Sequence, residues 1–393
     1  MFMEKELPQA WLALTIGFLT SAISAINNWK VSPLIPTFMS EFNLSSYALA
    51  GVLVGIVGAV AVFVVLPGGL LVSRYGPKRV IALSLSATAI GSFSQVFAPS
   101  FALLLAGRAL EGFGSALTLV SSSTLISNHF SSRHLGIAMG IFAAAPPLGS
   151  LISLNLSAVV SALYGWRTMW IIGSGLTLPV LAGLFLLKGE RKSSAQDYSL
   201  RGSFSNASIW LIPLAYFAMV ASGQCIWAWG PTYLSEVRGL NMSYASFIPT
   251  ITSIMALLVS PFGGWLSDRT NVRKWVILAP LLVLGVLYPA VPYVATSYFA
   301  IMMILIGIFN NIIPAGVLSE VVKLSGPSTA VGLSVNYLYI QMSIMVGPPF
   351  FGLILDVTHS WEASFFSLIA FIIIGLLGIL FATKYDRKKS DSR

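Results

Sequence analysis

Long runs of apolar residues, joined by short polar connections, make up most of this chain. A helix needs about 20 residues to cross the hydrocarbon core of a bilayer. Only 9% of the 393 residues are charged, whereas a soluble domain carries about 25%, so most of the surface cannot face water. The sequence therefore predicts an all-α polytopic membrane protein with twelve transmembrane helices, at residues 10–38, 46–72, 79–98, 101–127, 134–162, 167–187, 207–232, 244–267, 275–293, 297–319, 328–355 and 362–383.

The longest polar connection divides these runs into two sets of six. It reads KGERKSSAQDYSLRGSFSN, residues 188–206, and is basic and rich in serine. We expect an N-terminal six-helix bundle at 1–188, a cytoplasmic linker at 189–206, and a C-terminal six-helix bundle at 207–393 that ends in a short basic tail. The start, MFMEKELPQAW, leads into an apolar run without a small-residue cleavage site, which predicts a first membrane helix rather than a signal peptide.

The basic residues lie mostly on one side of the predicted helices. Of the 22 Lys and Arg residues, Arg167 and Arg238 fall in the opposite loops and Lys30 and Arg108 fall within helices, which leaves 18 on one side. Cytoplasmic loops carry such an excess, so we expect a multi-pass plasma-membrane protein with both termini in the cytoplasm. The net charge of +9 is spread over short clusters between apolar runs, which favours contact with membrane lipid and excludes a nucleic-acid partner. The single cysteine, Cys225, excludes an intramolecular disulfide, and we expect no metal and no cofactor.

One basic segment occurs twice. GGLLVSRYGPKR at 68–79 matches GGWLSDRTNVRK at 263–274, at an offset of 195 residues. Trp166 and Trp361 match at the same offset. Two six-helix halves duplicated in parallel are typical of secondary transporters.

These motifs resemble the major facilitator superfamily, and the resemblance covers essentially the whole chain. The family's loop between helices 2 and 3 reads approximately G-x-L-A-D-R-x-G-R-K, and here Ser73 stands where the aspartate is expected, whereas the second copy keeps Asp268. GRALEGFGSA (107–116) resembles the helix-4 motif, and APPLGS (145–150) is a degenerate form of the helix-5 motif. The resemblance implies two pseudo-symmetric six-helix bundles with the superfamily fold. It also implies that the protein is not an enzyme.

The resemblance also implies a role for the repeated loop. In the family, its charges form a network that holds the cytoplasmic side shut in the outward-open state. Basic residues are favoured there because a helix that ends at the cytoplasm presents a partial negative charge. A second interpretation is that Lys78 and Arg79 serve only as positive-inside anchors. The gating residues implied are Gly69, Ser73, Arg74, Gly76, Arg79, Asp268, Arg269 and Lys274.

Three ionisable residues fall inside predicted helices, namely Lys30, Arg108 and Glu111. Such residues cost free energy in a membrane and indicate a functional site by default. Arg108 and Glu111 lie on one helix face at spacing i, i+3, and either form a structural pair or act separately, with Arg108 attracting an anion and Glu111 carrying a proton. Lys30 either extends to the membrane interface or faces a central cavity beside Asn27.

Further substrate-binding candidates follow from the helices that line the central cavity in the family. Buried amides mean either hydrogen bonds between helices or a water-filled site, and both interpretations remain open. Together with Lys30 and Arg108, the candidates are Asn27, Asn28, Gln224, Trp227, Asn310, Asn311, Asn336, Tyr337 and Gln341.

The function that this pattern favours is secondary active transport by alternating access. The phosphate-binding sequence GxxxxGK[ST] is absent, and the three histidines fall in loops on opposite sides, which disfavours an enzyme. Two in-membrane cations against one acid favour a small, carboxylate-like organic anion as substrate, with ion or exchange coupling. The alternative is a proton-coupled efflux pump for hydrophobic, drug-like compounds. We expect a monomer whose partners are this small molecule and membrane lipid.

Overall fold

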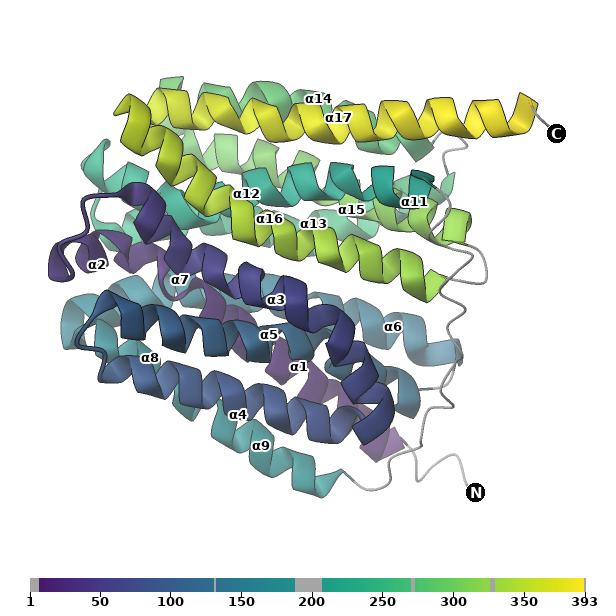
Figure 1. Cartoon of the computed structure of the whole chain (residues 1–393), viewed down its shortest axis with the longest axis horizontal. Coiled ribbons are helices and arrows are strands. Elements are labelled where there is room, and N and C mark those ends of the chain that lie inside the picture. Colours follow the sequence, from purple (N-terminus) through teal and green to yellow (C-terminus); the bar gives the residue numbers. More distant parts are fainter. Residues whose placement is uncertain (1–6, 131, 188–206, 270–272, 326–328, 392–393) are drawn as a thin grey trace. The chain divides into compact units, whose positions relative to one another are not determined.

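The computed structural model describes residues 7–130, 132–187, 207–269, 273–325 and 329–391, and these residues fold into helices joined by short turns (Figure 1). In the part of the chain that the structure describes, eleven helical segments are long and apolar enough to cross a membrane. Helix α4 (Pro77–Val96) is less apolar because it carries Lys78, Arg79 and four serines. Its 20 residues nevertheless span about 30 Å. The all-α, polytopic fold expected from the sequence is confirmed.

The chain divides into two compact units, Met1–Asn43 with Ile56–Gln196, and Leu44–Gly55 with Asp197–Arg393. The expected linker, 189–206, lies outside the described residues. The helices of the first half are α1 (Leu7–Trp29), η1 (Ser32–Leu34), α2 (Ile35–Glu41), α3 (Tyr47–Tyr75), α4, α5 (Phe101–His129), α6 (Ser132–Ala143), α7 (Ala145–Tyr164), α8 (Trp166–Gly175) and α9 (Thr177–Leu186). Those of the second half are α11 (Ala207–Leu211), α12 (Pro213–Glu236), α13 (Met242–Arg269), α14 (Arg273–Ala290), η2 (Val291–Tyr293), η3 (Thr296–Tyr298), α15 (Phe299–Ser325), α16 (Thr329–Thr358) and α17 (Trp361–Asp391).

Small residues bring the helices of the N-terminal unit close together. Helix α1 packs on α5 and α7, and α4 packs along α5. A Cβ atom at Gly149 of α7 would lie 2.4 Å from the carbonyl oxygen of Ala22 on α1. A Cβ atom at Gly91 of α4 would lie 2.7 Å from the carbonyl oxygen of Gly107 on α5. Only glycine permits this approach, which is the usual basis of close helix contact in membranes.

Aromatic side chains fill one end of the C-terminal unit, where α12, α16 and α17 meet. Trp229 of α12 stacks on Phe351 of α16 with ring centroids 6.2 Å apart, and its indole N–H donates to the carbonyl of Pro348 at 2.9 Å. Tyr233 meets Phe365 of α17 edge to face at 5.1 Å. Such pairs add to the burial of apolar area, so these rings fix the three helices together.

Helix α3 belongs to both units. Its first residues group with the C-terminal unit and the rest with the N-terminal unit. Asp356, near the end of α16, accepts hydrogen bonds from the backbone N–H groups of Tyr47 (2.7 Å) and Ala48 (2.9 Å) and from the Ser46 hydroxyl (2.6 Å). The first N–H groups of a helix have no partner within it, so this carboxylate caps the start of α3 within the C-terminal unit.

Candidate functional site

The three ionisable residues predicted to lie within the membrane meet in the N-terminal unit. The Glu111 carboxylate accepts from Lys30 Nζ through Oε1 and from Arg108 Nη1 through Oε2, each at 2.6 Å. All three side chains have no exposed surface. Two cations therefore share one carboxylate in a fully buried cluster, and Lys30 does not extend to the interface.

The end of helix α1 supplies the negative charge density that this cluster otherwise lacks. Arg108 donates through Nη1 to the carbonyl of Asn27 at 2.7 Å and through Nη2 to the carbonyl of Asn28 at 3.0 Å. The last carbonyls of a helix have no partner within it, and the helix dipole places about half a negative charge there. Arg108 thus caps α1, which explains how a second cation is held beside a single carboxylate.

Lys30 has partners on three further elements. Its ammonium donates to Asn27 Oδ1 at 2.8 Å and to the Ser92 hydroxyl of α4 at 2.6 Å, and it lies 4.6 Å from the centre of the Trp170 ring of α8. Ser92 in turn donates to the carbonyl of Trp170 at 2.8 Å. Neither Ser92 nor Trp170 was among the sequence candidates. Nothing in the sequence distinguishes Ser92 from the other three serines of α4. Trp170, in the segment WRTMW, could have been chosen as an aromatic partner for a cation.

Asn28 presents the only partly exposed side chain among the N-terminal substrate candidates. Its amide donates to the Ser115 hydroxyl at 3.0 Å, and Ser24 donates to the same hydroxyl at 3.1 Å. Its Oδ1 atom is buried and has no hydrogen-bond partner among the residues that the structure describes. Arg108 holds the backbone of Asn28, so the buried cations lie directly behind this polar surface.

The C-terminal candidates fall into two groups. Trp227 donates to the Thr252 hydroxyl at 2.7 Å, Asn310 accepts from Tyr288 at 3.4 Å, and Asn311 donates to the Gly307 carbonyl at 2.8 Å. These three therefore form hydrogen bonds within the unit. By contrast, Asn336 is 1% exposed, and within the described ranges both polar atoms of its amide lack a hydrogen-bond partner, as does Gln224 Oε1. Tyr337 and Gln341 follow on α16 and are partly exposed.

The first copy of the repeated loop forms a sharp turn between α3 and α4. Gly76 has φ 83° and precedes α4, a backbone conformation that favours glycine. The Ser73 hydroxyl donates to the Leu70 carbonyl of its own helix at 2.9 Å, and the Arg74 guanidinium lies 5.4 Å from the Tyr75 ring centre. A Cβ at Gly69 would meet nothing within 4 Å. The side chains of Asp268, Arg269 and Lys274 lie outside the described residues.

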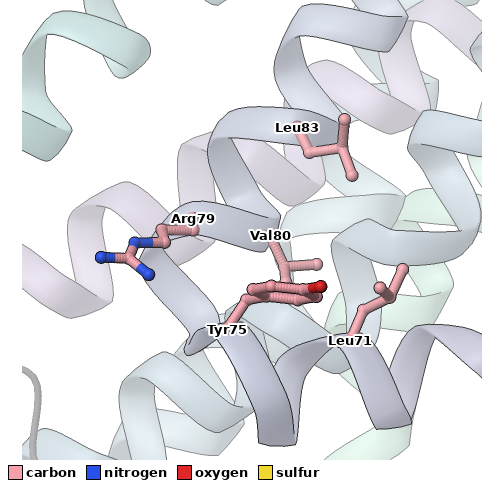
Figure 2. Close-up of a pocket in the computed structure, with 5 residues that line it drawn as sticks. All are labelled: Leu71, Tyr75, Arg79, Val80 and Leu83. Atoms are coloured by element: carbon pink, nitrogen blue, oxygen red, sulfur yellow. The ribbon is translucent and has the colours of Figure 1, made fainter.

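Arg79 lines a cavity of about 180 Å³ between α3 and α4, together with Leu71, Tyr75, Val80 and Leu83. Figure 2 shows the Tyr75 ring beside Val80 and Leu71, with the Arg79 guanidinium directed away from them. Within the described ranges, no three His, Cys, Asp or Glu side chains lie close enough together to hold a metal ion.

Comparison with known proteins agrees with this architecture. The family model described as Major Facilitator Superfamily matches residues 17–271 and 214–393. The chain is 22% identical to the hexuronate transporter of Bacillus subtilis (strain 168), over 93% of this chain and 92% of that protein. It is 23% identical to the citrate-proton symporter of Klebsiella pneumoniae, over 72% and 70% of the two chains. A solved structure of a bacterial homologue of the human lysosomal transporter Spinster has a TM-score of 0.84 at 16% identity, covering 97% of this chain and 98% of that one. The family that the motifs predicted is thereby confirmed, and the chain belongs to the Major Facilitator Superfamily as a membrane transporter rather than an enzyme.

Proposed function

We propose that this transporter carries a small organic anion of the carboxylate class across the plasma membrane by alternating access, with ion or exchange coupling. The observation that carries the proposal is the buried cluster of Lys30, Arg108 and Glu111, in which cations outnumber the carboxylate. The names of the relatives, which include hexuronate and citrate transporters, support the same substrate class.

The cluster favours an anion at the polar surface of Asn28. Charges inside a membrane act through a low dielectric and are screened little. Arg108 lies behind Asn28 and bonds its carbonyl at 3.0 Å, so an anion at the Asn28 amide experiences the field of the buried cations without touching them. In the C-terminal unit we favour two substrate contacts: the Asn336 amide and the Oε1 atom of Gln224, which have no hydrogen-bond partner among the described residues.

Glu111 is the residue that we assign to coupling. Protonation of its carboxylate raises the net charge of the cluster by one, which strengthens the attraction for an anion. A proton and an anionic substrate therefore bind more tightly together than separately, which is the linkage that a symporter needs.

Uptake into proteoliposomes tests the substrate class. Radiolabelled glucuronate and citrate are supplied with and without an inward proton gradient, and tetraphenylphosphonium serves as the lipophilic cation. We expect carboxylate uptake that Asn28→Ala and Asn336→Ala reduce, whereas Glu41→Gln, which changes the partly exposed pair with Arg167, leaves it unchanged. Movement of the lipophilic cation without uptake of any carboxylate would replace the proposal with the efflux alternative.

The orientation and the oligomeric state are part of the same proposal. The excess of Lys and Arg on one side of the helices supports cytoplasmic termini, and we propose that the protein acts as a monomer. A C-terminal fusion to green fluorescent protein should fluoresce, while the same fusion to alkaline phosphatase should be inactive. The reverse pattern would invert the topology.

A further inference from the structure

A second cavity lies at the end of the N-terminal unit where α4 begins and α5 and α9 end. Its volume is about 660 Å³. Leu125 of α5, Leu184 of α9 and Leu187, which follows α9, form a buried floor that belongs to the apolar core of the unit. Ala82, Ser86, Leu181 and Phe185 form the walls, and Phe185 is 85% exposed. The cavity is therefore an apolar groove that opens on the outer surface of the helices.

Basic side chains surround one end of this groove. Lys78 and Arg79 come from the first turn of α4, and His129 is the last residue of α5. Lys78 donates to the Leu187 carbonyl at 3.0 Å, and His129 Nδ1 donates to the Leu125 carbonyl at 2.8 Å, so both are fixed to the groove. Arg79 is exposed. Every residue that lines the cavity is basic, neutral or apolar, so this end of the groove carries an excess of positive charge.

Arg79 also lines the smaller cavity of about 180 Å³ between α3 and α4 (Figure 2). Helix α4 thus has an apolar cavity on each side, and one residue, Arg79, lines both. From Arg79 to Ser86 the larger groove runs along two turns of α4, or about 10 Å. A basic residue that lines two apolar cavities matches a ligand with one anionic head and two hydrocarbon chains.

We propose that this end of the N-terminal unit is a binding site for an anionic phospholipid. The phosphodiester binds the Arg79 guanidinium, which offers two parallel N–H donors to phosphate oxygens, and Lys78 adds a second positive charge beside it. One acyl chain lies in the α4–α9 groove and the other over Leu71, Val80 and Leu83. An anionic lipid binds in preference to a zwitterionic one because the latter brings its own ammonium group to a site that is already positive.

Native mass spectrometry of the full-length protein tests this site. The protein is purified in detergent, stripped of lipid, and titrated with phosphatidylglycerol or phosphatidylethanolamine with identical chains. We expect phosphatidylglycerol to bind more tightly, and Arg79→Gln to weaken its binding about fivefold. Arg74→Gln is the matched control, because Arg74 is an exposed cation of the same loop and lines neither cavity; it should leave binding unchanged.

A variant that keeps the charge separates a lipid site from a simple anion site. Ala82→Phe fills the larger groove and should reduce phosphatidylglycerol binding while Lys78, Arg79 and His129 remain. Glycerol phosphate, which has the head but no chains, should not bind in the same concentration range. The proposal would be overturned if the two lipids bound equally or if Arg79→Gln and Arg74→Gln had equal effects. It would also be overturned if the Ala82→Phe variant bound phosphatidylglycerol like the parent, or if glycerol phosphate bound as tightly as the lipid. Thermal unfolding of each variant in detergent verifies that it is folded.

Discussion

Neutralising Glu111, which is fully buried between two cations, should destabilise the N-terminal unit far more than neutralising the partly exposed Glu41. The Glu111→Gln variant keeps one carbonyl oxygen but places an NH₂ group where the second carboxylate oxygen stood. One of the two cations, each now 2.6 Å from a carboxylate oxygen, then faces a donor instead of an acceptor. Removing one partner of a fully buried ion pair costs about 3–5 kcal/mol, and we expect a loss in this range.

The Lys30→Met variant is compared with Glu111→Gln, because it removes one of the two cations and keeps the carboxylate. It leaves Arg108 and Glu111 as a neutral pair, with the carbonyls of α1 still bound to Arg108, so it should cost less than Glu111→Gln. In the double variant Lys30→Met/Glu111→Gln, only Arg108 remains charged, and it keeps both carbonyl contacts. We expect the double variant to be more stable than the sum of the single effects predicts, by about 1–3 kcal/mol.

The test is the free energy of unfolding of each variant, measured by denaturant titration in mixed micelles. Glu41→Gln is the control, since its pair with Arg167 is 34% and 47% exposed and such pairs contribute about 0–1 kcal/mol. Equal losses for Glu111→Gln and Glu41→Gln, or additive effects in the double variant, would refute the view that Glu111 holds two buried cations.

Three further outcomes follow from the packing and the loops. Asp356→Asn should weaken the cap of α3 by about 1–2 kcal/mol and speed hydrogen exchange at the amides of Tyr47 and Ala48; unchanged exchange would show that the carboxylate charge does not hold this helix end. Gly149→Ala should destabilise the protein by about 1–3 kcal/mol, because its Cβ would lie 2.4 Å from a backbone oxygen of α1. Gly140→Ala should not destabilise it, because a Cβ there meets no described atom within 4 Å. Equal free energies of unfolding for the two variants would contradict this role of Gly149. Asp268→Asn should slow transport more than Ser73→Ala, since only the former removes a charge from the gating loops; equal uptake rates would assign these loops to anchoring alone.

Charge and hydropathy were sufficient to predict the fold and to identify Lys30, Arg108 and Glu111, because an ionisable side chain in an apolar run is conspicuous. Their contacts were not predictable. The i, i+3 spacing indicated the pair of Arg108 with Glu111, but the contact of Lys30 with Glu111 joins residues 81 positions apart and leaves no periodic pattern. The capping of α1 by Arg108 depends on where that helix ends, and helix boundaries are poorly defined within a continuous apolar run.

The hydrogen-bond partners of the buried amides were not predictable from the sequence either. Asn310 and Asn336 look alike in the sequence, yet one accepts from Tyr288 and the other has no partner within the described structure. The difference depends on which helix faces each side chain. The grouping of Leu44–Gly55 with the C-terminal unit likewise has no counterpart in the lengths of the loops, from which a division at 189–206 was expected.

The cap of α3 has a consequence for biosynthesis. The Ser46 hydroxyl and its acceptor Asp356 lie 310 residues apart, so the ribosome makes the start of α3 long before it makes the carboxylate that completes it. At about 5–20 residues per second, the interval is roughly 15 to 60 s. During that time the first N–H groups of α3 depend on water, lipid headgroups or the insertion machinery. The start of α3, which groups with the C-terminal unit, therefore receives its cap only after α16 has been made.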